Sequence, residues 1–588
     1  MTKKKISFGR VFWPSLTASI VILVIIGTVI AITIGSLMGS APQYAVGEKA
    51  VLHLQLKGDI GELSQSEISP SSLSFINKTG LADILYGLEN AAEDDRIKGV
   101  FIELENARCG YATASEIRKA IQRFQDQDKF VVAYHSGEAV SLKQYYIASA
   151  ANENYGFPSS MFEFLGLGTE LMFYKGLFDK LDLEMQVVRG SDNHFKSAVE
   201  PYFLTEMSDS SRLQVTRYLN SIWSDLRSDI AENKTIDANR LNAIADSGWV
   251  RRVSDAVEYD MIDEVKYRDE VIALIAKKLS IENPDDINFK AFEKYASKKF
   301  LNNQKIANGK NANVAVIVAE GPVVVKGEGL SSQKITKLLR NARKDEDIET
   351  IVFRVNSPGG SALASDEIWR EVKLAREQKK VIVSMGDVAA SGGYYIAAAA
   401  DTIFAESTTI TGSIGVFGVI PYTGAMLENK LGLSFDRVST NKHAILSTNE
   451  KLSDEEYAII QEEVDFIYDQ FLERVAAGRN MKKDDVNTIA RGRVWTGKDA
   501  LEIGLVDTLG GLNDAINYAI SSTGIDSPVV QYFPKVKKEP WMEILESIEE
   551  SEKDQATTPR ELRALYEKVR EIENFTGIQA RLPYEIVW

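Results

Sequence analysis

The chain reads Asp387-Val388-Ala389-Ala390-Ser391-Gly392-Gly393-Tyr394-Tyr395-Ile396 over the stretch that decides its fold. A diverged copy of this stretch occurs about 250 residues earlier: at an offset of 249, Tyr394-Tyr395-Ile396-Ala397 falls on Tyr145-Tyr146-Ile147-Ala148. At the same offset, residues 351–360 fall on residues 102–111. Self-similarity at a fixed offset indicates one fold that is present twice.

The two copies differ where chemistry could occur. Leu142 stands in the first copy at the position of Ser391 in the second. The glycine pair after the serine is replaced by Lys143-Gln144, and Gly412-Ser413 is replaced by Glu163-Phe164. Only the second copy can therefore supply a serine nucleophile.

Composition narrows the class of protein. The 588 residues carry a formal net charge of −16 and a pI near 5.1, which argues against a nucleic-acid partner because phosphate binding needs a basic surface. The single cysteine, Cys109, excludes an intramolecular disulfide framework. The four histidines are scattered without the spacing of metal ligands. We expect no metal and no cofactor.

The amino-terminal segment predicts a membrane anchor. Residues 11–47 contain no charged side chain, and residues 16–38 are dense in Ile, Val, Leu and Ala, which is long enough to span the hydrocarbon core. The alternative is a cleaved signal peptide, whose apolar region is usually shorter. Basic residues precede the segment, so the bulk of the chain is expected on the periplasmic or extracellular side of the inner (cytoplasmic) membrane.

The repeat and the anchor divide the chain into four parts. We expect a cytoplasmic stub and transmembrane anchor at 1–47, a first copy at 48–307, a second copy at 308–532 and a charged tail at 533–588. Within each copy, short apolar runs alternate with amphipathic helical segments, which predicts an α/β fold.

Local patterns place individual elements. Strands are expected at 49–57, 129–134 and 314–319, and a helix at 112–125. The charged stretch at 255–300 is predicted to be largely helical. A linker rich in Gly and Asn follows at 308–313.

Two loops of the second copy carry the candidate chemistry. A buried strand at 350–355 breaks at Asn356-Ser357-Pro358-Gly359-Gly360 before a helix at 362–380, and such a glycine loop exposes the amide donors that an oxyanion hole needs. The next strand, at 381–385, leads to Ser391 at the start of a buried helix at 394–400. There the serine is either a nucleophile near the positive helix end or simply a helix cap. Asp387 is interpreted as a turn residue.

A serine nucleophile needs a base, and no histidine occupies a corresponding position in the two copies. A lysine can take this role if burial lowers its pKa from about 10.4 toward the operating pH. The chain has many lysines, so chemistry alone does not select one.

Four motifs occur together and in order: Phe195-Lys196-Ser197-Ala198-Val199-Glu200-Pro201, the Asn356 to Gly360 loop, the Ser391 stretch, and Thr411-Gly412-Ser413-Ile414-Gly415-Val416. With them, residues 48–530 resemble the long, duplicated form of the signal peptide peptidase A family (peptidase family S49). The resemblance implies two tandem α/β domains of repeated ββα units, like those of ClpP and crotonase, behind one transmembrane helix. It also implies a membrane-anchored serine peptidase with a Ser-Lys dyad.

The resemblance also assigns roles to residues. Ser391 looks like the nucleophile, Lys196 the general base and Ser413 the serine that orients the lysine, while Gly359 or Gly360 resembles the oxyanion amides. Short relatives carry their lysine about fifty residues after the serine, so Lys442 stays open as an alternative base.

The expected activity is degradation of cleaved signal peptides and other short hydrophobic peptides by a homo-oligomer, with a tetramer implied by the family. Two rival functions stay open. One is a crotonase-like enzyme whose loop amides bind an acyl-CoA thioester, and the other is an inactive membrane scaffold.

Overall fold

The computed structural model describes residues 46–68, 75–234, 236–297, 312–327 and 329–535. The expected anchor at 16–38 lies outside these residues, as do most of the linker at 308–313 and nearly all of the tail at 533–588. Among the residues described, no helix has both the length and the apolar character needed to cross a bilayer. The anchor therefore stays a prediction.

The first copy is built on a parallel sheet with the strand order β10-β7-β5-β4-β1-β11. Strand β5 is buried over 131–135, and β1 and β4 are continuously buried over 50–52 and 99–102, as expected when helices cover both faces of a parallel sheet. The strands are β1 (Ala50–Asp59), β4 (Ile97–Arg108), β5 (Phe130–His135), β7 (Glu153–Gly156), β10 (Glu264–Val265) and β11 (Phe289–Ala291).

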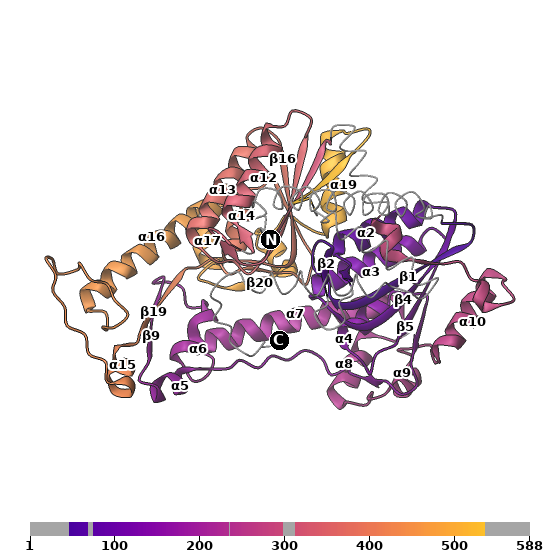
Figure 1. Cartoon of the computed structure of the whole chain (residues 1–588), viewed down its shortest axis with the longest axis horizontal. Helices are drawn as coiled ribbons and strands as arrows, with labels where there is room; N and C mark the ends of the chain where they lie inside the picture. The colour runs from indigo at the N-terminus through magenta and orange to yellow at the C-terminus, as the bar shows by residue number, and fades with distance from the viewer. Residues whose placement is uncertain (1–45, 69–74, 235, 298–311, 328, 536–588) are drawn as a thin grey trace, which may run out of the picture. The chain divides into compact units, whose positions relative to one another are not determined.

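The second copy repeats this order as β21-β17-β16-β15-β12-β22. Helices α12 (Ser332–Lys344), α13 (Ala362–Arg376) and α14 (Gly392–Ala397) lie on one side of the sheet, and α19 (Leu512–Thr523) lies on the other (Figure 1). The same strand order in both copies agrees with the duplication seen in the sequence. The strands are β12 (Val314–Glu320), β15 (Thr350–Ser357), β16 (Lys380–Ala390), β17 (Thr402–Ala405), β21 (Thr508–Leu509) and β22 (Val530–Phe533).

Several predicted element boundaries are wrong. The strand expected at 381–385 continues to Ala390 because its far end pairs with a further strand, β18 (Ile410–Gly412), which in turn pairs with β20 (Val494–Thr496). Helix α13 ends at Arg376 rather than at 380. The stretch at 255–300 holds the predicted helices, among them Val253–Glu258 and Arg268–Leu279, and it also supplies the edge strands β10 and β11.

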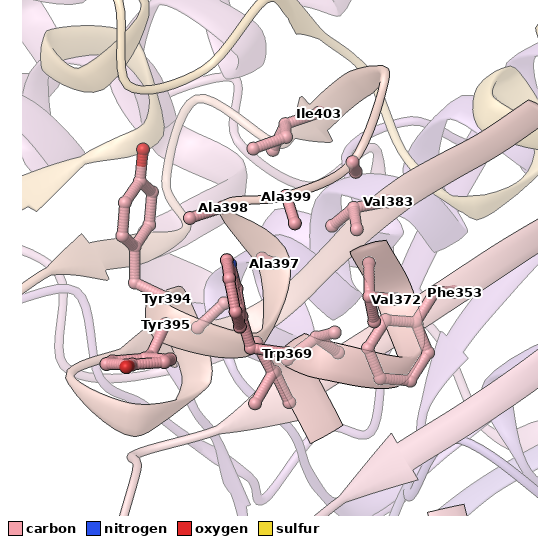
Figure 2. Close-up of a cluster of buried hydrophobic side chains, with 14 of the residues drawn as sticks. Phe353, Trp369, Val372, Val383, Tyr394, Tyr395, Ala397, Ala398, Ala399 and Ile403 are labelled. Atoms are coloured by element: carbon pink, nitrogen blue, oxygen red, sulfur yellow. The ribbon is translucent and has the colours of Figure 1, made fainter. Parts of the chain in front are cut away.

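Helix α14 packs tightly because its sequence is rich in small residues. Ala397, the last residue of α14, and Ala398 and Ala399 directly after it are buried in the core beside Trp369 and Val383 (Figure 2). Small side chains let the helix approach the sheet closely and fix its position by packing. The serine that precedes the helix is therefore held by a rigid part of the core.

The two copies belong to one compact unit, in which a strand and a helix cap of one copy bind to elements of the other. Strand β9 (Glu184–Arg189) of the first copy pairs antiparallel with β19 (Phe417–Tyr422) of the second over all six residues (Figure 1). Asp387 is not a turn residue: its carboxylate accepts hydrogen bonds from Gly110 N at 3.1 Å and Thr113 N at 2.9 Å. It thereby caps helix α3 (Tyr111–Gln125) of the other copy.

A buried arginine on β15 joins the two copies. Arg354, on β15, is fully buried, and its guanidinium donates to Glu62 at 2.9 Å and to Glu116 at 2.6 Å, both in the first copy. Burial raises the pKa of Glu62 to about 7, although Arg354 opposes this shift. The positive charge of Arg354 offsets the desolvation cost of burying these two carboxylates.

We therefore expect Arg354→Met to lower the free energy of unfolding by about 3–5 kcal/mol, because it leaves buried carboxylates without their cation. Denaturant titration measures the change. The matched control is Arg123→Met, which breaks a half-exposed pair between the copies, to Asp514, and is expected to cost less than about 1 kcal/mol. Equal effects of the two variants would contradict this account.

Candidate active site

Ser391 occupies a strained junction between β16 and α14. Its backbone has φ 55° and ψ −118°, a conformation that residues with a side chain rarely adopt. Its amide donates to Gly412 O at 2.8 Å, which ties the junction to β18. A sharp strand-to-helix turn of this kind presents a nucleophilic hydroxyl away from the backbone.

Glycines allow the loop after β15 to reach this junction. A Cβ at Gly393 would lie 2.4 Å from Ser357 O, and one at Gly359 would lie 2.6 Å from Gly392 N. Gly359 also has a φ of 94°, in the left-handed region that favours glycine. The first copy has Lys143-Gln144 at the positions of Gly392-Gly393, so the same approach is not available there.

Lys196 of the first copy reaches into the second copy and meets the serine. Its side chain is buried, with 3% of the residue exposed, and Nζ lies 3.0 Å from Ser391 Oγ. Nζ also lies 2.9 Å from both the carbonyl oxygen and the Oγ of Ser413. Three of the predicted site residues, from segments up to 217 positions apart, are therefore in direct contact.

Burial lowers the pKa of the Lys196 amine to about 7. The cause is desolvation alone: its polar neighbours are serine oxygens, and the ring of Phe417 lies 5.9 Å away. An ammonium loses much of its hydration in such a site, which favours the neutral amine. A neutral amine has two N–H donors and one lone pair. Ser413 can accept both hydrogens, which leaves the lone pair for the hydroxyl of Ser391.

The predicted oxyanion glycines lie beside the serine, but their amides differ. Gly359 N donates to Ser357 Oγ at 3.2 Å, so this amide is already engaged. The amide of Gly392, the first residue of α14, is available as a donor, because the first amides of a helix lack intrahelical acceptors. Sequence reasoning did not select Gly392, although its position directly after the serine is the available signal.

Lys442 is in a different environment. Its side chain is 65% exposed and pairs with Glu455 on the surface. The structure brings Lys196, not Lys442, to the serine.

Two further features near the site were missed in the sequence. Gln214, a buried residue of α7 (Asp209–Asn233), bonds to both neighbours of Lys196. The turn at 491–493 lies between Lys196 and Ser413: Phe195 N donates to Arg491 O at 2.9 Å, and Ser413 N donates to Arg493 O at 2.6 Å. Neither feature has a local sequence signal, since each depends on contacts between distant segments.

Comparisons with known proteins agree with this architecture. The protein-family model described as Peptidase family S49 matches residues 123–282 and 373–526, two ranges that begin 250 residues apart. A second model, Clp protease, matches residues 314–411. The second copy thus has a ClpP-like α/β fold.

Similar proteins extend over most of the chain. A protein of Arabidopsis thaliana named "Serine protease SPPA, chloroplastic" is 34% identical over 497 residues, covering 82% of this chain and 71% of that protein. A protein of Haemophilus influenzae named "Protease 4" is 32% identical over 506 residues, covering 82% of this chain and 80% of that protein.

These matches place the chain among the serine proteases. More narrowly, the chain belongs to peptidase family S49, and both of its repeats match the family.

Proposed function

We propose that this protein is a membrane-anchored serine endopeptidase in which Ser391 is the nucleophile and Lys196 the general base. The observation that carries the proposal is the 3.0 Å contact between Lys196 Nζ and Ser391 Oγ, made by an amine whose pKa burial lowers to about 7. The family membership and the strained serine junction support the same reading.

The proposed reaction has two halves. The Lys196 lone pair takes the proton of Ser391 as Oγ attacks the peptide carbonyl carbon, and the ammonium then protonates the leaving amine as the C–N bond breaks. In the second half, Lys196 takes a proton from water, which attacks the acyl ester and breaks its bond to Oγ. Ser391 regains the proton from Lys196, so the enzyme returns to its starting state.

We assign to the amides of Gly360 and Gly392 the stabilisation of the negative charge that forms on the carbonyl oxygen. Fixed amide donors stabilise the tetrahedral intermediate more than the planar substrate, which lowers the barrier. Ser413 holds the amine by accepting its hydrogens at 2.9 Å, so the lone pair stays directed at Ser391.

A serine-reactive fluorophosphonate tests the nucleophile directly. The detergent-solubilised full chain is treated with the probe, its cleavage of a fluorogenic apolar peptide is followed, and the labelled peptide is mapped by mass spectrometry. We expect one covalent label, on Ser391, that rises in step with the loss of cleavage. A label elsewhere, or full cleavage with Ser391 labelled, would contradict the proposal.

The proposed substrates are cleaved signal peptides and other short hydrophobic peptides, met at the inner membrane on its outer side. The apolar, uncharged run at 16–38 and the basic residues before it support this location. Alkaline extraction of membranes is expected to leave the full chain in the pellet, and its release into the supernatant would rule out an anchor.

We also propose a homo-oligomer, with four copies implied by the family. Large apolar side chains are exposed on the segments around β9 and β19, and such surfaces in soluble parts of proteins commonly mark contacts between chains. They include Leu165, Met172, Leu177, Leu431, Val438 and Leu446. Light scattering in detergent is expected to give a multiple of the 65.3 kDa chain mass, and a monomer mass would exclude this assembly.

A further inference from the structure

The backbone that carries Lys196 has little regular structure of its own. Lys196 precedes a single 3-10 turn, Ser197–Val199, and its own φ and ψ, −76° and 71°, are neither helical nor extended. A side chain that must hold its amine 3.0 Å from a serine in the other copy needs its backbone fixed from outside.

Gln214 fixes this backbone on both sides of the lysine. Its Nε2 donates to Phe195 O at 3.0 Å and to Ser197 Oγ at 2.7 Å. Its Oε1 accepts from Val494 N at 3.2 Å, in strand β20 of the second copy. The residue is 3% exposed. The nitrogen of its amide donates to the first copy, and the oxygen accepts from the second.

The contact with Val494 leads directly to the serine. Val494 pairs with Gly412 across β20 and β18, and Gly412 O accepts the amide hydrogen of Ser391 at 2.8 Å. The residue before Val494, Arg493, accepts from Ser413 N at 2.6 Å. The path from Lys196 through Gln214, Val494 and Gly412 to Ser391 therefore closes into a ring at the contact between Nζ and Oγ.

We propose that Gln214 is a positioning residue for the reaction, which sets the distance between the Lys196 amine and Ser391 by clamping the lysine segment to strand β20. Gln214 has no contact with the serine and acts only through its neighbours. This inference rests on the proposed function of Ser391 and Lys196.

The test is Gln214→Met in the full chain, which keeps the length of the side chain and removes all three hydrogen bonds. We expect kcat to fall about ten- to hundredfold, because misplacing a reacting group by about 1 Å costs up to about 10²-fold. KM should stay within about twofold. The acidic limb of the pH profile should move, since a loosened segment lets water reach the amine.

Two more variants separate positioning from stability. Ser197→Ala removes one of the three bonds and should lower kcat less than Gln214→Met does. The effects of the two changes should not add in the double variant, because both act on the same contact. Ser221→Ala, two turns further along α7, removes a 3.1 Å contact with Thr496 on the same strand and should leave kcat and the pH profile unchanged.

The outcomes distinguish this inference from the proposed function. A normal kcat and pH profile in Gln214→Met, or the same loss in Ser221→Ala, would overturn the positioning role. Ser391→Ala is measured in parallel: if it stays active, the proposed function fails as well, whereas an inactive Ser391→Ala beside an unimpaired Gln214→Met removes only the inference. If Gln214→Met does not fold, Ser197→Ala and the more conservative Gln214→Glu decide, since Glu keeps the acceptor for Val494 N but loses the donors to the lysine segment.

Discussion

Ser391→Ala is expected to lower kcat for a fluorogenic apolar peptide by about 10⁴-fold or more, because the variant lacks the hydroxyl that attacks the peptide carbonyl and forms the acyl ester. The fold should remain, since the serine side chain is not needed for the amide bond to Gly412 O that holds the junction. Alanine has to adopt the same φ of 55° as Ser391. The backbone strain is therefore the same in both proteins, and we expect the variant to lose little stability.

Circular dichroism and the denaturation midpoint serve as the controls for folding. A second control is Ser391→Cys, which keeps a nucleophilic atom at the same position and should retain a small residual activity towards activated esters. Cleavage at the wild-type rate by a well-folded Ser391→Ala would end the serine-peptidase mechanism for this chain, and it would reopen the crotonase-like reading of the loop amides.

Lys196→Met is expected to lower kcat/KM by about 10³-fold, the scale of a lost general base. Methionine fills most of the space of the buried aliphatic chain. Because burial of the amine lowers its pKa to about 7, the variant also removes a poorly solvated group, and stability should not fall. The matched control is Lys442→Met, which changes an exposed lysine and should leave kcat/KM unchanged.

The pH dependence of the wild-type enzyme checks the same assignment. The base must be neutral to accept a proton, so kcat/KM should rise with pH and level off above about pH 7, where the amine is deprotonated. Lys196→Met should lose this limb. An unchanged limb in Lys196→Met, or its loss in Lys442→Met, would move the base to another residue.

Much of the fold could be predicted because its signals are local. The run at 314–319 is apolar and short, and it forms β12, while the amphipathic run at 112–125 forms α3. The far end of β16 could not be predicted, because residues 388–390 are held as a strand by pairing with β18, which is distant in the sequence. A pairing partner about twenty residues away leaves no periodic pattern in the strand itself.

The candidate site could likewise be predicted only where its signals are local in the sequence. Ser391 could be singled out from glycines and a helix start that are adjacent in the sequence. Lys196 needed the family resemblance, because nothing in its own surroundings shows that it will be buried against the other copy. Arg354 and Gln214 were missed for the same reason: their partners lie in the other copy, and a polar residue reads as exposed until its partners are known.

The contact between Lys196 and Ser391 spans 195 residues and two repeats, which has a consequence for the history of the gene. With the amine on one repeat and the hydroxyl on the other, deletion of either repeat removes half of the proposed pair, so we expect selection to retain both repeats. Other residues also depend on the opposite repeat: the Thr113 hydroxyl of the first repeat donates to the Asp387 carboxylate of the second. A substitution at such a contact changes the surroundings of its partner in the other repeat, so we expect the two halves to evolve together.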